Sequence, residues 1–325
     1  MVLLKISNKI IKGIVKSGES LICVLMVDKL LIKEKLVQNS YEYCNQIIEH
    51  LGGKVNKVAI IYPSLKKDLD CECLFLQYIP QLNSFDISGN CGNAIVAAAV
   101  YYMNKKQTRN IEALIVENIN TNKRIKVMLQ NFAEDFFEVE VTFFDPEGSI
   151  TSTSLPTGNI IDKIHVNNKE YLASIVDTGN PYIFIERSQL DLSISEFKDP
   201  NLKIYREFEL IRHKAKCLIG LNENSVFPKF SIVNKVAMNN SIEARMISVP
   251  TWHKAFALTG LACLIKAVLI SGSVVNQNIS IDDASKEITV YFINKKKMKV
   301  KYQCINQNIS TICISQTVKV LKGGF

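Results

Sequence analysis

The segment Asp86-Ile87-Ser88-Gly89-Asn90-Cys91-Gly92-Asn93 runs without a break into an apolar, alanine-rich sequence, Asn93–Lys106. This sequence is apolar on every side of a helical projection and is long enough to form a helix that is buried all round. A second sequence of this kind, Lys254–Ser271, lies in the C-terminal half of the chain. We therefore predict two buried helices, one in each half.

Both buried helices follow strand-like segments that match each other. Asn56-Lys57-Val58-Ala59-Ile60-Ile61 precedes Asn90-Cys91-Gly92-Asn93 in the first half, and Pro228-Lys229-Phe230-Ser231-Ile232-Val233 precedes Trp252-His253-Lys254-Ala255 in the second. Short β-branched runs bounded by turn residues recur along the whole chain and predict many more strands. The repeat predicts an α/β (α+β) fold with two similar lobes, each a mixed sheet around a central helix, and a cleft between them.

The predicted join between the lobes is Asp145–Gly158, which is rich in Pro, Gly, Ser and Thr. We expect an N-terminal lobe of residues 1–150, completed by residues 306–325, and a C-terminal lobe of residues 151–305. Two further helices are predicted, one over Ser40–Leu51 and one over Glu207–Leu218, because a glycine closes each pattern.

Composition limits the class of protein. The 325 residues are 47% hydrophobic and 22% charged, which is typical of a globular chain and not of a disordered one. The net charge of +8 is spread along the chain, whereas nucleic-acid binding usually needs a concentrated basic stripe. Nine cysteines in no regular framework favour a reducing compartment, and four histidines without zinc spacing argue against a metal site.

Neither a signal peptide nor a membrane span is expected. Lysines at positions 5, 9 and 12 interrupt the first apolar stretch, and the longest apolar run, Ala94–Met103, is too short to cross a bilayer. We expect a cytoplasmic protein with no membrane or nucleic-acid partner. A homodimer is left open.

Cys91 is the strongest candidate for a catalytic residue. Glycines on both sides of Asn90-Cys91 let the backbone approach a ligand closely, and the free N–H groups at the start of a helix favour a carboxylate. The same groups favour a thiolate, so Cys91 is a candidate acid or base. An ordinary helix cap with a buried structural thiol explains the pattern equally well.

Three other positions are candidates with simple structural alternatives. Lys57 begins an apolar strand and is a candidate base, although a lysine there can also extend into solvent. His253 opens the second predicted helix, where it could bind a carboxylate or serve only as a cap. Asn180 lies in a turn whose chemistry needs no function to explain it.

Taken in order, these motifs resemble the PrpF-type isomerases of the diaminopimelate-epimerase-like fold, whose members isomerise 2-methylaconitate, methylitaconate or oxalomesaconate. The resemblance covers most of the chain from about Gly52 onward. It is carried by Lys57-Val58-Ala59-Ile60, Cys73-Leu74-Phe75-Leu76-Gln77, Ser88-Gly89-Asn90-Cys91-Gly92-Asn93, Leu155-Pro156-Thr157-Gly158-Asn159, Gly179-Asn180-Pro181, Arg245, Ser248, His253-Lys254-Ala255 and Thr259-Gly260.

The resemblance implies an isomerase that moves a proton and a double bond on a small unsaturated carboxylic acid without a cofactor or metal. It implies that Lys57 is the main base and that Cys91 is its partner. Related racemases use two cysteines, but here His253 stands at the second position, which disfavours racemisation. The residues expected to bind substrate are Ser20, Ser88, Gly89, Asn90, Gly92, Asn93, Asn180, Ser248 and His253.

Two segments depart from the family pattern. Lys16–Ile22 is the best counterpart of the family's glycine-rich opening segment, but it has lost two glycines and carries Glu19. Gln316–Lys319 lacks the arginines that are usual there. Two alternatives therefore stay open: a degenerate member that binds a carboxylate or a partner protein without catalysis, and a biosynthetic isomerase of the phenazine type with Glu19 as its acidic residue.

Overall fold

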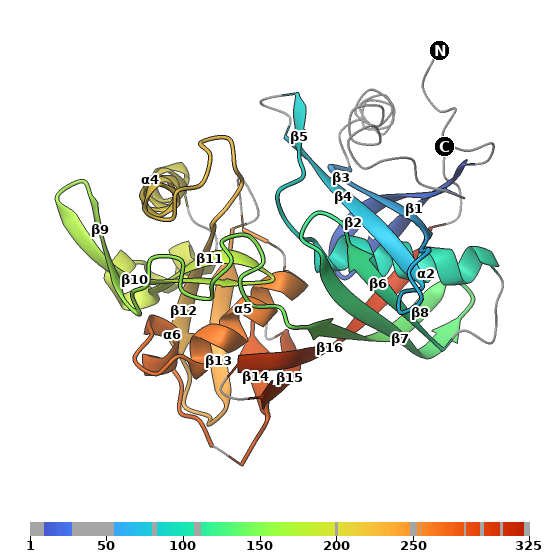
Figure 1. The fold of residues 1–325 in the computed structure, drawn as a ribbon. Coiled ribbons are helices and arrows are strands. Elements are labelled where there is room, and N and C mark those ends of the chain that lie inside the picture. Colours follow the sequence, from blue (N-terminus) through green and yellow to red (C-terminus); the bar gives the residue numbers. More distant parts are fainter. Residues whose placement is uncertain are drawn as a thin grey trace. The chain divides into compact units, whose positions relative to one another are not determined.

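The computed structural model describes residues 10–27, 55–79, 83–106, 112–198, 201–247, 252–253, 255–282, 284–292, 296–305 and 308–321. The predicted helix over Ser40–Leu51 lies outside these residues. The chain divides into two compact units, each containing a mixed sheet and a buried helix (Figure 1). Unit 1 comprises Met1–Phe144 and Ser315–Phe325, and unit 2 comprises Asp145–Ile314.

Unit 1 is built mainly of strands around one helix. Its elements are β1 (Ile10–Ser17), β2 (Ser20–Val27), β3 (Lys57–Pro63), β4 (Cys71–Ile79), β5 (Ser84–Asp86), α2 (Gly92–Lys106), β6 (Ala113–Asn118), β7 (Lys123–Ala133), β8 (Phe136–Phe144) and the end of β16 (Asn308–Val320).

The sheet of unit 1 alternates between antiparallel and parallel pairs. Strand β1 pairs antiparallel with β2, β2 parallel with β3, β3 antiparallel with β4, and β4 parallel with β6. Strands β6, β7 and β8 complete the order as an antiparallel meander. The end of β16 pairs with β1, and Val320 donates its backbone N–H to Asp135 beside β8. The strands of unit 1 therefore form a closed ring.

The ring encloses α2, which packs against β1, β2, β3, β4, β6 and β7. Every residue of this helix from Gly92 to Met103 is buried. Four of these residues are alanines, whose small side chains let strands approach the helix closely from several sides. Gly13 of β1 makes such an approach: a Cβ atom there would lie 2.5 Å from a ring carbon of Tyr101.

Unit 2 repeats this plan with additional helices. Its elements are β9 (Asp162–Val166), β10 (Lys169–Thr178), β11 (Asn180–Glu186), the 3-10 helix η2 (Arg187–Leu190), α3 (Ile194–Lys198), α4 (Leu202–Leu218), β12 (Lys229–Lys235), β13 (Ser241–Met246), α5 (Leu258–Leu269), α6 (Val274–Gln277), β14 (Glu287–Tyr291), β15 (Lys297–Ile305) and the first part of β16.

The strand pairings of unit 2 occur in the same sequence as those of unit 1. Pairs β10–β11, β11–β12, β12–β13, β13–β14 and β14–β15 are antiparallel, parallel, antiparallel, parallel and antiparallel in turn. Helix α5 lies in the chain between β13 and β14, as α2 lies between β4 and β6. The prediction of two similar lobes, each with a mixed sheet around a buried helix, is confirmed.

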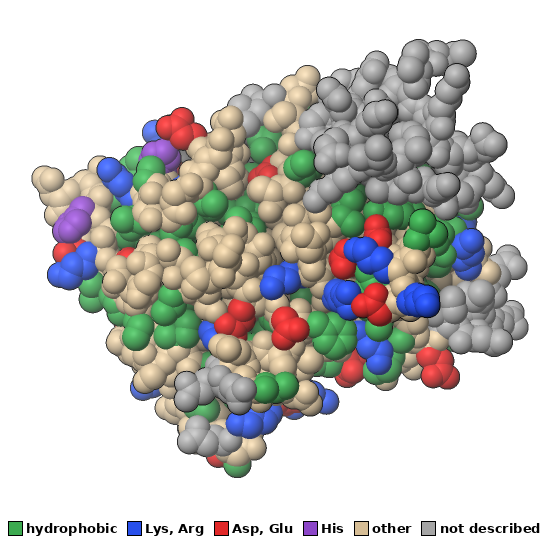
Figure 2. Space-filling view, viewed as in Figure 1, with side chains coloured by type: hydrophobic (Ala, Val, Ile, Leu, Met, Phe, Trp, Pro, Cys, Tyr) green, Lys and Arg blue, Asp and Glu red, His purple; other side chains and the backbone are tan. Residues whose placement is uncertain are grey.

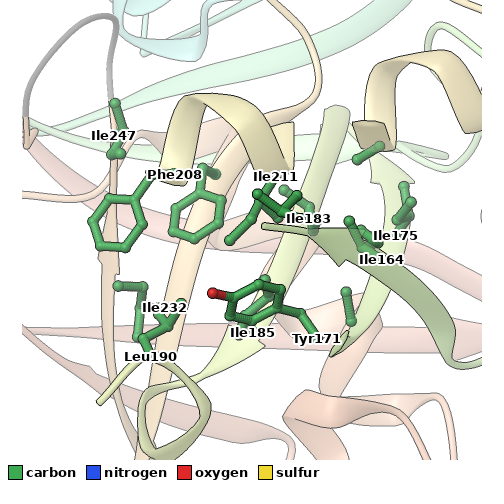
Figure 3. Packing of buried hydrophobic residues seen from close by; sticks show 14 of the residues in the cluster. Ile164, Tyr171, Ile175, Ile183, Ile185, Leu190, Phe208, Ile211, Ile232 and Ile247 are labelled. Atoms are coloured by element: carbon green, nitrogen blue, oxygen red, sulfur yellow. The ribbon is translucent and has the colours of Figure 1, made fainter. Parts of the chain in front are cut away.

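Both faces of β11 are covered, and its residues divide between them. Ile183 and Ile185 face the core under α4, together with Phe208 and Ile211 of that helix (Figure 3). Tyr182 faces the opposite way, toward Phe256 and the first turn of α5. Successive side chains of a strand point to opposite faces, so a strand that is covered on both sides is apolar throughout. The predicted helix Glu207–Leu218 begins earlier, with Asn201 as its cap.

A partly buried ion pair anchors the end of α5. Lys266 Nζ donates to Glu147 Oε1 at 2.8 Å, and the side chains of the two residues are 11% and 18% exposed. The N–H of Ile309 donates to the same carboxylate at 2.7 Å, and Ser154 Oγ donates to its other oxygen. Burial would raise the pKa of Glu147, but the hydrogen bonds from Lys266 and Ser154 outweigh it and lower that pKa.

The surface carries charges of both signs. On the face shown in Figure 2, Lys and Arg side chains are interspersed with Asp and Glu. In unit 1, for example, Lys66 lies between Glu72 and Glu117, and Arg124 contacts Asp68 at 2.6 Å. None of the described helices has both the length and the apolar character needed to cross a membrane.

The close approach of β1 to α2 yields a stability prediction. Gly13→Ala should lower the free energy of unfolding by about 1–3 kcal/mol, because the new methyl group collides with the buried ring of Tyr101. In a Tyr101→Leu background the same change should cost clearly less, since the ring is gone. Urea denaturation of the four proteins measures this. Equal costs in the two backgrounds would show that the ring does not limit residue 13.

The Lys266–Glu147 ion pair yields a second stability prediction. Lys266→Met should lower the free energy of unfolding by on the order of 3 kcal/mol, because it leaves a partly buried carboxylate without its cation. Adding Glu147→Gln should recover part of this loss. Because the folded-state pKa of Glu147 is lowered, its contribution is present above the unfolded-state pKa and is lost as pH falls through the folded-state value. Urea denaturation between pH 7 and pH 3 should show the wild type losing its advantage over Glu147→Gln.

Candidate functional site

Lys57 and Ser20 meet at one edge of the sheet in unit 1. Strands β2 and β3 are parallel, and the pairing of Cys23 with Val58 brings the beginnings of both strands to the same edge. Ser20 is the first residue of β2 and Lys57 is the first residue of β3. Lys57 Nζ donates a hydrogen bond to Ser20 Oγ at 3.2 Å. The lysine is half-buried and the serine is 7% exposed, so the amine is held at the sheet edge.

Asn93 connects this pair to the beginning of α2. It is the second residue of the helix and is 4% exposed. Its Nδ2 donates to Ser20 Oγ over a long 3.5 Å, and its Oδ1 accepts a hydrogen bond of 2.8 Å from Gln316 Nε2. The site therefore joins residues from β2, β3, α2 and β16. The sequence prediction named Ser20, Lys57 and Asn93, whose roles with substrate stay predictions. It marked Gln316–Lys319 only for lacking the family's usual arginines and did not predict the contact between Gln316 and Asn93.

Cys91 immediately precedes α2 and is half-buried. Its carbonyl accepts the N–H groups of Ala94 and Ile95 at 2.9 and 3.0 Å, which begins the helix. The N–H groups of Gly92 and Asn93 lie ahead of these bonds and have no partner within the helix. Cys91 is also close enough to Cys73 to affect it: burial first, and then the thiols of Cys71 and Cys91, raise the pKa of Cys73.

The loop before Cys91 is held by polar contacts. Ser88 is exposed, and its N–H and hydroxyl both donate to Asp86 Oδ1, at 2.7 and 2.6 Å. Asn120 spans the loop and β4, because its Nδ2 donates to the carbonyls of Phe75 and Ile87 at 2.7 and 2.8 Å. Sequence reasoning also missed Asn120, whose only signal is a turn residue after a strand.

The remaining predicted residues of this segment are buried. Gly89 and Gly92 are buried, and Asn90 is 4% exposed. Ser88, Gly89 and Asn90 precede Cys91, and Gly92 and Asn93 begin α2, although the exposed Ser88 is already bonded to Asp86. The substrate-binding roles of these five residues stay predictions.

Unit 2 has a polar pair at the corresponding place. Asn180, the first residue of β11, donates from Nδ2 to the hydroxyl of Thr259, the second residue of α5, at 3.2 Å. Ser20 and Asn93 hold the same positions on β2 and α2 of unit 1. Gly179 permits the approach, since its φ is +77° and a Cβ atom there would lie 3.2 Å from the Thr259 carbonyl oxygen. The role of Asn180 in substrate binding also stays a prediction.

The prediction that His253 opens the second buried helix is wrong. Helix α5 begins at Leu258, and its cap residue Ala257 is extended. His253 lies before the helix, and its N–H donates to the carbonyl of Met246 at 2.9 Å. Its Nδ1 accepts the N–H of Ala255 at 3.1 Å. These bonds keep the histidine off the helix, and its role with substrate stays a prediction. Ser248 lies outside the described residues.

Glu19, the unexpected acid of the Lys16–Ile22 segment, has a cationic neighbour. Its carboxylate lies 3.7 Å from Lys16 Nζ in the same turn, and the two side chains are 28% and 46% exposed. An exposed pair of this kind is weak, but it offsets part of the negative charge. Glu19 is thus compatible with an anion bound nearby.

The arrangement in unit 1 combines three chemical abilities. The primary amine of Lys57 is hydrogen-bonded to the hydroxyl of Ser20. The thiol of Cys91 lies at the start of the buried helix α2, which also offers N–H groups and the positive end of the helix dipole. Such a helix end binds carboxylates well. An amine and a thiol can both carry a proton to or from carbon. The site is therefore suited to proton transfer on an anionic molecule.

Comparison with known proteins agrees with this geometry. The family model described as PrpF protein matches residues 28–325. YraM of Bacillus subtilis is 28% identical over 70% of this chain and 73% of its own length. The 3-methylitaconate isomerase of Eubacterium barkeri is 26% identical over 75% of each chain.

A solved structure shows the same fold. The crystal structure titled methylitaconate-delta-isomerase superposes with a TM-score of 0.73 and 20% sequence identity, covering 97% of this chain and 94% of its own. The diaminopimelate-epimerase-like fold that the sequence motifs implied is thereby confirmed. With the family match over most of the chain, the protein is an isomerase that belongs to the PrpF family.

Proposed function

We propose that this isomerase moves a proton, and with it a double bond, along a small unsaturated carboxylic acid. The observation that carries the proposal is the 3.2 Å hydrogen bond from Lys57 Nζ to Ser20 Oγ, beside the start of α2. It holds an amine next to a helix end that favours a carboxylate. The printed name of the relative 3-methylitaconate isomerase fits a substrate of this class.

Lys57 is proposed as the base. Its amine contacts a hydroxyl, and it makes no ion pair with any carboxylate in the part of the chain that the structure describes. Among the described residues, no carboxylate paired with this amine therefore competes for the proton that it must take up and release. Ser20 contacts both Lys57 and Asn93, which keeps the amine close to the helix end, where one substrate carboxylate would bind to the N–H groups of Gly92 and Asn93.

The reaction then needs two proton transfers. Lys57 removes a proton from the carbon next to the double bond, the C–H bond breaks, and its electron pair spreads over the allyl system. The positive end of α2 stabilises this charge as it forms. Cys91 returns a proton to the far carbon, a new C–H bond forms, and the double bond shifts. After each turnover Lys57 carries an extra proton and Cys91 lacks one, so proton exchange with solvent must restore both groups. No electrons enter or leave, so the sequence of steps requires no redox cofactor.

Lys57 yields the central activity prediction. Lys57→Ala should reduce isomerisation of 3-methylitaconate by on the order of 10²- to 10⁴-fold, because the base is lost. It should also abolish deuterium incorporation into the substrate in D₂O, which proton NMR measures directly. Lys67→Ala is the matched control, because Lys67 is an exposed lysine of the same unit. Undiminished exchange in Lys57→Ala would remove this lysine from the mechanism.

Cys91 yields a prediction with a different signature. Cys91→Ala should slow formation of the isomerised product while Lys57 continues to exchange the substrate proton with solvent. The ratio of exchange to isomerisation, read from the same NMR samples, should therefore rise several-fold. Cys217→Ala, at an exposed cysteine of unit 2, should leave the ratio unchanged. A Cys91→Ala enzyme with the wild-type ratio would show that another group returns the proton.

The same experiment separates catalysis from binding alone. If the wild-type protein binds small unsaturated di- and tricarboxylates tightly but exchanges no deuterium into any of them, the proposed chemistry is wrong.

A further inference from the structure

A directed chain of hydrogen bonds runs from the backbone of β16 to the candidate base. The N–H of Thr317 donates to Gln316 Oε1 at 3.2 Å, and Gln316 Nε2 donates to Asn93 Oδ1 at 2.8 Å. Asn93 Nδ2 donates to Ser20 Oγ at 3.5 Å, and Lys57 Nζ donates to the same oxygen at 3.2 Å. All of these residues belong to unit 1.

The direction of this chain of hydrogen bonds follows from its first bond. A backbone N–H can only donate, so the side-chain oxygen of Gln316 must face Thr317. The amide nitrogen of Gln316 then faces Asn93, and the oxygen of Asn93 must accept from it. The nitrogen of Asn93 is therefore the atom that faces Ser20. Each amide therefore has one orientation that satisfies this chain of hydrogen bonds.

The orientation of Asn93 determines where the hydrogen of the Ser20 hydroxyl can point. A serine oxygen has two acceptor positions and one hydrogen. Asn93 Nδ2 and Lys57 Nζ both donate to this oxygen and occupy both acceptor positions. The hydrogen of Ser20 is consequently directed away from both of them and can be donated to a third group.

The packing around Gln316 preserves this arrangement. Gly18 has a φ of +54° in the turn between β1 and β2, and a Cβ atom there would lie 2.8 Å from Gln316 Nε2. The N–H of Gly18 donates to the carbonyl of Thr317 at 3.0 Å, which fixes the turn to β16. A side chain at residue 18 would displace the Gln316 amide from Asn93.

We infer that Gln316 is a positioning residue, which acts through Asn93 to present the hydroxyl hydrogen of Ser20 to a substrate carboxylate. This inference rests on the proposed function, because it concerns the same substrate and the same lysine. A hydrogen bond between a hydroxyl and a carboxylate is charge-assisted and therefore contributes strongly to binding. Loss of the orientation should weaken substrate binding more than it slows turnover.

The test is a double-mutant cycle between Gln316 and Ser20. Gln316→Met keeps the side-chain length but removes the donor, so Asn93 can turn its oxygen toward Ser20 and take its hydrogen. The Kd for 3-methylitaconate, measured by calorimetry, should rise roughly ten- to hundredfold in Gln316→Met and in Ser20→Ala. The Kd of the double variant should be no higher than that of Ser20→Ala, because Gln316 acts only through the serine.

Two further variants separate positioning from a general loss of structure. Gln130→Met, at an exposed glutamine of β7, should leave Kd unchanged. Gln316→Glu cannot donate when ionised but can donate when protonated. Its binding defect relative to wild type should therefore shrink as pH falls from 7 toward 4.5. Gln316→Met, which has no titrating group, should show a constant defect.

The inference is overturned if the Gln316→Met and Ser20→Ala effects on Kd multiply in the double variant, or if the Gln316→Glu defect does not change with pH. This outcome leaves the proposed function intact when the wild-type enzyme isomerises the probe. Conversely, the wild-type protein could bind the probe without exchanging deuterium into it, which would contradict the proposed function. If the double-mutant cycle were non-additive in that case, it would still support the role of Gln316.

Discussion

The burial of α2 is the constraint on which the rest of unit 1 depends. A helix that is apolar on all sides must be covered on all sides, and here β1, β2, β3, β4, β6 and β7 cover it. Strands can surround a helix so closely only where side chains are small, as at the alanines of α2 and at Gly13. The polar groups of such a helix are confined to its ends. The beginning of α2, with Cys91, Gly92 and Asn93, is therefore where polar chemistry can lie next to a buried core.

The two units use one scaffold with different polar groups. In each unit the first residue of a strand bonds the second residue of the buried helix, as Ser20 with Asn93 and as Asn180 with Thr259. The next strand begins with a lysine in both cases, Lys57 in β3 and Lys229 in β12. Their surroundings differ, since Lys57 bonds Ser20 whereas Lys229 lies over the ring of Phe227. The shared scaffold explains the weak sequence repeat, and the different contacts explain why proton transfer is assigned to unit 1.

Membership of the PrpF family and the contacts of Lys57 support one another but answer different questions. The family match shows that the chain belongs to the PrpF family, and the relatives, which include an isomerase named for 3-methylitaconate, support an isomerase. The hydrogen bond to Ser20 suggests how an amine could be held ready beside a bound carboxylate. The altered segment around Glu19 does not oppose this, because Lys16 offsets part of its charge. The local electrostatics therefore remain suited to an anionic substrate.

The sequence by itself determined the two buried helices, the strands before them and the position of Cys91 ahead of α2, because periodicity and glycine placement are local properties. It was wrong about His253, which lies ahead of α5 and donates a backbone hydrogen bond to Met246 that no local pattern reveals. Only the tertiary structure brought Gln316 to Asn93 and Asn120 to the loop before Cys91. Contacts between residues far apart in the chain depend on strand register, which is set when the whole sheet closes around its helix.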